Sequence, residues 1–241
     1  MKTPQPDAPH RSSLREDAKP RPRAPRRGLR FVALTLVSVG LILILALLGL
    51  TTGPLEIAPF QALAILVDGE SAGSAGEVAI LRDLRLPRVL LAFLVGAALA
   101  LAGAQMQAWF RNPLASPDLI GVSAGASFGA IAAFVTGLAL RSDAYVPLFA
   151  FVAAFLTLFL IRRIATRNGD TPVATLLLAG IAVSAFLGAI NGYLFARSFD
   201  SLEQARQIAF WLLGSLQDRS WEHVWLVLPG TVLGTVVAAL K

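Results

Sequence analysis

Residues 82–129 read RDLRLPRVLLAFLVGAALALAGAQMQAWFRNPLASPDLIGVSAGASFG. This stretch has an arginine-rich start, a long apolar run, a polar break at Arg111-Asn112-Pro113 and a second apolar run that contains several glycines. About 20 apolar residues in a helix, rising about 1.5 Å each, cover the hydrocarbon core of a bilayer. Each run is long enough for this, so the stretch predicts two consecutive membrane-spanning helices.

The composition is that of a membrane protein. Hydrophobic residues make up 56% of the 241 residues and charged residues only 15%, unlike the mixture of a soluble domain. Nine Lys/Arg and three Asp/Glu lie in residues 1–30 and account for the whole net charge of +6. This segment is rich in Pro, Arg and Ser, so we expect a disordered basic cytoplasmic tail that touches membrane lipid rather than nucleic acid.

Apolar runs and breaks predict an all-α, polytopic bundle over residues 31–241. Six spans are expected, at residues 31–50, 87–110, 119–140, 146–161, 172–195 and 221–240. Two shorter apolar segments, 57–67 and 198–217, are expected to be helices at the membrane surface, and GESAGSAG (69–76) a flexible loop. With the N-terminus in the cytoplasm, fourteen Lys/Arg lie inside and seven outside, so the positive-inside rule favours this orientation.

No motif for bond chemistry is present in the sequence. It lacks a phosphate-binding G-x-x-x-x-G-K-[ST] loop, a nucleophile elbow and an H-E-x-x-H zinc motif. With no cysteine and two distant histidines, neither a disulfide nor a metal site is expected. The predicted spans contain essentially no Asp, Glu or Lys, which disfavours an ion-coupled carrier. We therefore expect no catalytic residue and no cofactor bound directly by the chain.

Small residues recur four apart along several predicted spans. Gly121, Gly125 and Gly129 share one face of the third span, and this spacing lets helix backbones approach closely in lipid. Close packing is the expected role, although a few such positions could instead face a substrate pathway. Before this span, Asn112-Pro113 predicts a helix break, because proline lacks the amide donor and disfavours helix at the preceding residue.

Polar side chains near the spans are few, and two sets stand out. Gln105, Gln107 and Asn191 must each find a partner or face water. For the two glutamines the sequence leaves two alternatives open, a place along a translocation pathway or a hydrogen bond between helices. Arg85 and Arg88 lie three residues apart outside the membrane, against the charge rule. The planar guanidinium suits carboxylates of a partner. The two arginines could therefore dock an acidic protein surface, or they could simply be solvated.

Five segments together resemble one transporter family. They are LRLPR (84–88), GAALALAGAQMQ (96–107), RNPLASPDLIGVSAGA (111–126), LLLAGIAVSA (176–185) and WLLGSL (211–216). Over roughly residues 31–241 the sequence is similar to the FecCD-type permeases. These are the transmembrane subunits of ABC importers for iron-siderophore chelates and vitamin B12. The third segment is a specific motif of the family.

The resemblance implies a ten-helix membrane bundle that pairs into a homodimer or close heterodimer in the bacterial inner membrane. It also implies a cytoplasmic ATP-binding subunit that hydrolyses ATP, and a periplasmic or lipid-anchored binding protein that delivers the chelate. Arg85 and Arg88 match family arginines that dock glutamates of that binding protein. The second and fifth helices line the pathway in the family, which gives weight to Gln105, Gln107 and Asn191. No resident metal is expected, because iron or cobalt travels inside its chelate.

The family continues, beyond the part that these 241 residues resemble, with a coupling loop and four more helices. We therefore expect about six of ten helices here, apparently truncated before that loop. The predicted function is a permease for ferric siderophores, with cobalamin or haem as alternative cargo. A truncated, non-transporting membrane paralogue is the alternative from another class.

Overall fold

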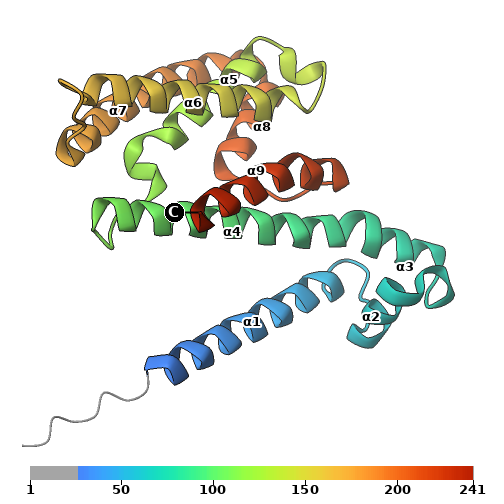
Figure 1. The fold of residues 1–241 in the computed structure, drawn as a ribbon. Helices are drawn as coiled ribbons and strands as arrows, with labels where there is room; N and C mark the ends of the chain where they lie inside the picture. The colour runs from blue at the N-terminus through green and yellow to red at the C-terminus, as the bar shows by residue number, and fades with distance from the viewer. Residues whose placement is uncertain (1–26, 241) are drawn as a thin grey trace, which may run out of the picture. The chain divides into compact units, whose positions relative to one another are not determined.

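The computed structural model describes residues 27–240, so most of the predicted basic tail lies outside the described residues. Within this range the chain folds into α-helices with short 3₁₀ and π-helical segments between some of them, and no strand is found there (Figure 1). The helices are α1 (Arg27–Thr51), α2 (Pro59–Asp68), α3 (Ala75–Ala79), α4 (Leu86–Phe110), α5 (Val122–Val135), α6 (Tyr145–Ala165), α7 (Val173–Arg197), α8 (Leu202–Leu213) and α9 (Trp221–Ala239). The all-α prediction is confirmed.

Helix α1 belongs, up to Gly49, to a compact unit of its own, and the residues from Leu50 onward form a second unit. α1 begins at Arg27 rather than at the predicted Phe31. The last proline of the tail is Pro25, and proline is tolerated only near the first turn of a helix. The 25 residues of α1 are apolar nearly all round, as in a helix that faces lipid.

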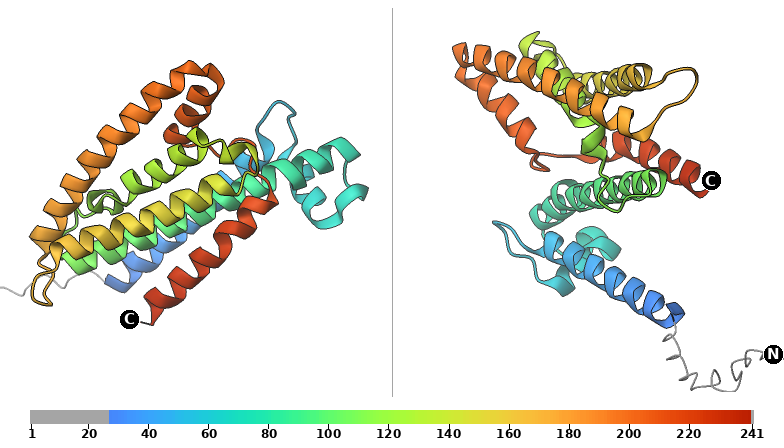
Figure 2. Two further views of the ribbon diagram at one scale, coloured as in Figure 1. Left: turned by 90° about the horizontal axis from the view of Figure 1, so that it is seen from above. Right: turned by 90° about the vertical axis from the view of Figure 1, so that its left-hand side faces the viewer.

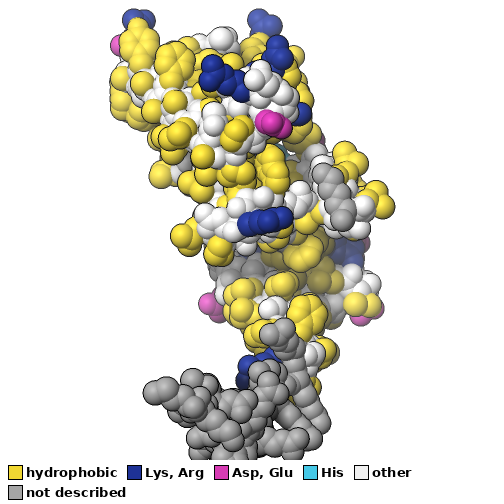
Figure 3. Space-filling view, turned by 60° about the vertical axis from the view of Figure 1, so that its left-hand side comes forward, with side chains coloured by type: hydrophobic (Ala, Val, Ile, Leu, Met, Phe, Trp, Pro, Cys, Tyr) yellow, Lys and Arg dark blue, Asp and Glu magenta, His cyan; other side chains and the backbone are white. Residues whose placement is uncertain are grey.

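The second unit contains two groups of packed helices (Figures 1 and 2). In one group α4 lies along α9, while α2 and α3 pack around the segment that precedes α4. In the other group α5 packs against α6, α7 and α8. The 3₁₀ segment η3 (Pro117–Ile120) contacts both α4 and α7 and so joins the two groups. Apolar side chains cover much of the surface drawn in Figure 3, as expected for helices surrounded by lipid.

Among residues 27–240, five helical stretches are long and apolar enough to cross a membrane, judged by length and composition alone. They comprise residues 28–51, 75–110, 145–165, 173–200 and 221–239. The third predicted span differs, because α5 has only 14 residues and is about 21 Å long. Gly121 and Gly137 have φ angles of 77° and 73°, a left-handed conformation that stops a helix. They cut the expected 119–140 helix at both ends.

The second predicted span starts earlier than its proline suggested. The π-helical segment η2 (Ile80–Arg85) joins α3 to α4 without a break. Of residues 69–76, predicted as a flexible loop, 69–71 form the 3₁₀ segment η1 and 75–76 begin α3, so only residues 72–74 lie outside a helix. This short loop ends at Ser74, whose side chain accepts from the Glu77 amide while the Glu77 carboxylate accepts from the Ser74 amide at 2.8 Å. This capping box begins the helix.

The break after α4 lies where the sequence predicts it. Arg111 adopts a left-handed conformation with φ of 50° at the end of the helix. The side-chain oxygen of Asn112 then accepts from the Leu114 amide at 2.9 Å, a turn that asparagine favours. Pro113 lies inside this turn. The chain thereby leaves α4 and enters the η3 turn that leads to α5.

Three glycines, Gly121 at the N-terminal end of α5 and Gly125 and Gly129 within it, lie where α5 packs closely against α6 and α7. A Cβ at Gly125 would collide with Thr157 of α6, and one at Gly129 with the backbone carbonyl of Phe149. Gly121 lies in the same way against a serine of α7. These contacts are what close packing through small residues requires.

The small-residue faces of the other spans are open over part of their length. A Cβ added to any of four glycines would meet nothing within 4 Å: Gly96, Gly188, Gly192 and Gly230. Gly180 of α7, in contrast, lies against the Leu119 carbonyl, which a Cβ would approach to 2.9 Å. The same spacing in the sequence therefore corresponds to contact throughout α5 but only in places along α7.

Candidate functional site

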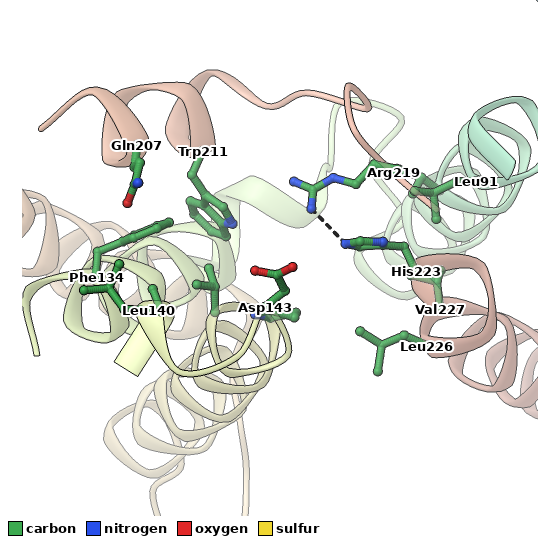
Figure 4. Close-up of a pocket in the computed structure, with 14 residues that line it drawn as sticks. Leu91, Phe134, Leu140, Asp143, Gln207, Trp211, Arg219, His223, Leu226 and Val227 are labelled. Atoms are coloured by element: carbon green, nitrogen blue, oxygen red, sulfur yellow. Dashed lines mark hydrogen bonds between the residues drawn. The ribbon is translucent and has the colours of Figure 1, made fainter. Parts of the chain in front are cut away.

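The candidate site is a cavity of about 560 Å³ at one end of the second unit, which we call the distal cavity. The N-terminal halves of α4, α6 and α9, the last turn of α5, the 3₁₀ segment η4 (Leu138–Leu140) and helix α8 surround it (Figure 4). Its lining combines apolar side chains, such as Leu91 and Leu226, with polar and charged groups. A volume of this size is typical of ligand pockets.

The charged groups of the distal cavity come from the loops before α6 and α9. Arg219 Nη1 lies 3.0 Å from His223 Nε2, and the Ser220 amide donates to His223 Nδ1 at 3.3 Å. The Asp143 carboxylate points toward this pair from the other side of the cavity (Figure 4). The distal cavity thus combines the guanidinium donors of Arg219 and the carboxylate acceptor of Asp143 with apolar walls. This combination suits a ligand or a protein surface that is itself partly polar and partly apolar.

Helix α8 contributes Gln207 and Trp211 to the same cavity. Ser201 caps the helix by accepting from the Gln204 amide, and the Gln204 side chain donates to the Phe134 carbonyl of α5 at 2.8 Å. Ala205 is buried on the inner face of the helix. This amphipathic helix confirms the short helix predicted within residues 198–217 and holds one wall of the cavity against α5.

Arg85, which the resemblance assigned to docking, points inward in this structure. Its side chain is only 7% exposed. Nη1 donates to the carbonyls of Leu50 at 2.7 Å and Thr51 at 3.0 Å, and Nη2 donates to the carbonyl of Leu55. The guanidinium therefore satisfies carbonyls at and just after the end of α1, and it is not presented at the surface.

Arg88 has the more open position that docking requires. Its side chain is 38% exposed, and Nη2 lies 3.8 Å from the carboxylate of Asp218, which is itself 87% exposed. An exposed pair of this kind contributes about 0–1 kcal/mol. Nε is buried without a hydrogen-bond partner among residues 27–240. The pair with Asp218 can therefore open at small cost.

The three predicted pathway residues lie apart from the distal cavity. Asn191 Nδ2 donates to the Ala124 carbonyl of α5 at 3.2 Å, while its buried Oδ1 has no partner in the described part of the chain. Of the two outcomes that the sequence allows for Asn191, a partner or water, the structure shows a partner on a neighbouring helix. Gln105 and Gln107 are exposed on the last turns of α4.

The residues of the distal cavity were missed because no motif joins them. Asp143, Trp211, Arg219 and His223 lie in three separate segments around α6, α8 and α9. The available signal was topological, since loops that follow alternate spans lie on the same side of a membrane. In the described residues no group of three or more His, Cys, Asp or Glu could hold a metal ion.

A sequence model of the FecCD transport family matches residues 41–241. The chain belongs to this family. Two FecCD-like relatives are similar over long stretches. The cobalamin import system permease protein of Halobacterium salinarum is 42% identical over 160 residues, which are 66% of this chain and 42% of that protein. The vitamin B12 import system permease protein of Salmonella paratyphi A is 38% identical over 206 residues, which are 84% of this chain and 57% of that protein.

A solved structure has the same fold as this FecCD-family chain. It shows an inward-facing conformation of an ABC transporter assigned to the metal-chelate type. The TM-score is 0.64 at 30% sequence identity, and the match covers 82% of this chain and 57% of that chain. The chain spans about half the length of the relatives it matches.

Proposed function

We propose that this chain is a transmembrane permease subunit of an ABC importer that carries a metal chelate into the cytoplasm. The match of residues 41–241 to the FecCD transport family is the observation that carries the proposal. The described spans supply a physical argument, because their charged side chains lie near helix ends, as Arg88, Arg162 and Glu222 do. Such spans offer no carboxylate relay for ion coupling, so a separate ATP-binding subunit has to provide the energy.

Two classes of metal chelate are candidates for the cargo. The sequence motifs pointed to ferric siderophores, and the metal-chelate type of the solved neighbour supports that class. The names of relatives that are 38% and 42% identical favour cobalamin, and we place it first. Both classes enclose their metal, so neither requires metal-ligating side chains in the permease. The chain itself would bind no cofactor and hydrolyse no ATP.

The proposal also assigns partners to the outer end and to the open faces of the bundle. We place the chain in a bacterial inner membrane with its N-terminus on the cytoplasmic side. In this orientation the distal cavity and Arg88 face the periplasm, where a periplasmic or lipid-anchored binding protein arrives. We assign docking of its carboxylates to Arg88. A second permease subunit would cover the open faces of the bundle, and Gln105 and Gln107, exposed on α4, would line the pathway.

Uptake in whole cells tests the cargo. The host should lack its own corrinoid and siderophore permeases and should supply the ATP-binding subunit and the binding protein. Labelled cobalamin, a ferric siderophore and haem are then offered in parallel. We expect uptake of cobalamin that Arg88→Glu abolishes and Arg141→Glu preserves, since Arg141 is exposed at the same end but does not line the distal cavity. If only the ferric siderophore is taken up, it replaces cobalamin as the proposed cargo. If none of the three compounds is taken up, the proposed import function is rejected.

A further inference from the structure

We propose that α2 is held in the lipid interface of the membrane by the exposed apolar side chains of Phe60, Leu63 and Val67, which we call the lipid face. The helix has 10 residues and is about 15 Å long, so it is too short to cross the membrane. Through the lipid face, α2 anchors the segment between α1 and α4 to the leaflet at which α1 ends. Only a membrane-spanning chain is required for this anchor, whatever the cargo and the partners.

Helix α2 is apolar on two opposite sides. Ala62 and Ile65 are fully buried against the rest of the second unit. On the other side Phe60 is 83% exposed, Val67 80% and Leu63 51%. Positions 60, 63 and 67 form one stripe, because residues three, four and seven apart share a face of a helix. A helix with water on its outer side carries polar residues there, so this stripe indicates apolar surroundings.

The polar and charged groups near α2 avoid the lipid face. Residues 57–67 contain no charged side chain, and Gln61 is the only polar residue among them. Its Nε2 donates to Glu77 Oε1 at 2.9 Å, so the amide is satisfied within the protein. The nearest acidic residues in the sequence are Glu56, before the helix, and Asp68, its last residue, and both are exposed. A helix with charge only at its ends suits immersion among lipids, because burying a charge there costs free energy.

Two spans mark the depth of α2 in the membrane. The apolar residues 31–50 rise about 30 Å as a helix, which is the thickness of the hydrocarbon core, so Leu50 lies at its boundary. Leu50 is buried in the same apolar cluster as Ile65 of α2. At the start of the α9 span, the Trp221 indole donates to the Arg82 carbonyl at 3.0 Å, and Arg82 Nη2 donates to the Ile65 carbonyl at 2.9 Å. Tryptophan favours the membrane–water interface, so both contacts place α2 where hydrocarbon meets headgroups.

This depth and this polarity select lipid as the occupant of the lipid face. Interfacial helices bury an apolar side about 5–10 Å into the region of headgroups and upper acyl chains, the depth at which the end of α1 and the start of α9 hold α2. Such helices carry a charged side toward water, whereas the inner side of α2 packs on protein through Ala62 and Ile65. A position between protein and lipid explains why α2 is apolar on both sides.

Nitroxide accessibility tests the contact with lipid. Residues 1–241 contain no cysteine, so Phe60→Cys, Leu63→Cys or Val67→Cys can carry a single nitroxide in the permease that contains this chain, any other cysteine being replaced by serine. The labelled permease is placed in vesicles of phosphatidylethanolamine and phosphatidylglycerol. Oxygen concentrates in hydrocarbon and a nickel chelate stays in water, so the rates at which the two collide with the nitroxide report its surroundings.

The control labels are Glu56→Cys and Glu70→Cys, at exposed positions before and after α2. We expect the ratio of oxygen to nickel collisions to be at least about threefold higher at the three positions of the lipid face than at the controls, as for an apolar side immersed in the interface. Equal ratios at all five positions would place the face in water. Low collision rates with both agents at the lipid face would place it against a protein. Either result would overturn the inference.

Paired substitutions test whether lipid contact holds α2 in place. A lipid surface requires apolar side chains of no particular shape, whereas a packed protein contact requires a matching shape as well. Phe60→Asn with Val67→Asn should therefore speed amide exchange of residues 59–68 in the same vesicles by at least about threefold, and Phe60→Leu with Val67→Leu should leave it near the wild-type rate. Protection of α6 in both variants shows that they are folded. Equal acceleration in the two pairs would indicate a protein contact, and none in the asparagine pair would mean that lipid does not anchor α2; each outcome contradicts the proposal.

Discussion

Substitution of Gly129 by alanine tests the close contact between α5 and α6. A Cβ at this position would lie 2.6 Å from the carbonyl carbon of Phe149 and 2.7 Å from the Cβ of Ala153. Carbon atoms in contact prefer separations of about 3.5–4.0 Å, so α6 would have to withdraw by roughly 0.8 Å or more. Two of the obstructing atoms are backbone atoms, and no change of rotamer can relieve them.

The matched control is Gly188→Ala in the middle of α7, where a Cβ would meet nothing within 4 Å. Alanine raises helix propensity in both variants by about the same amount. Their difference in unfolding free energy therefore reports packing alone, and overpacking of this kind costs about 1–3 kcal/mol. The assay is reversible unfolding in mixed micelles, followed by circular dichroism. Equal stability of the two variants would refute the α5–α6 contact.

Three other perturbations have defined outcomes. Trp221→Phe removes the donor to a backbone carbonyl of η2 and should lower the unfolding free energy by about 0.5–1.5 kcal/mol; no change would mean that this bond is not formed. The double variant Gln105→Leu, Gln107→Leu should change the unfolding free energy by less than about 0.5 kcal/mol, as substitutions at exposed positions do. It should nevertheless reduce uptake, and uptake at the wild-type rate would mean that neither glutamine lines the pathway. Because the chain has no cysteine, Ser142→Cys should react with an impermeant thiol reagent in intact cells and Asp170→Cys only after permeabilisation; the reverse pattern would invert the topology.

The spans could be predicted from the sequence because their signal is local. Long apolar runs with charge only at the ends specify membrane helices, and Asn112-Pro113 specifies a turn whatever surrounds it. The shortening of α5 was not predictable, because it depends on the left-handed conformations of Gly121 and Gly137. A glycine in a sequence does not reveal its φ angle. The same limit explains why Gly129 packs tightly while Gly188 is open.

The site was less predictable than the fold for a similar reason. Arg85 and Arg88 look equivalent in LRLPR, and the family resemblance treats them alike. Their difference arises because the carbonyls of Leu50 and Thr51 accept hydrogen bonds from Arg85, whereas Arg88 lies beside Asp218. The distal cavity likewise gathers Asp143, Arg219 and other side chains from separate loops. Contacts between distant segments decide both features, and no spacing in the sequence encodes them.

Reconstituted transport tests the central claim most directly. The permease that contains these 241 residues is assembled in proteoliposomes with an ATP-binding subunit and a substrate-binding protein of the importer, and entry of labelled cobalamin and a labelled ferric siderophore is followed with and without ATP. A permease of the FecCD family should accumulate one of these chelates only when ATP and the binding protein are both present, and Arg88→Glu should abolish the accumulation. Correct insertion and association with the ATP-binding subunit, without ATP-dependent uptake of any chelate, would contradict the claim.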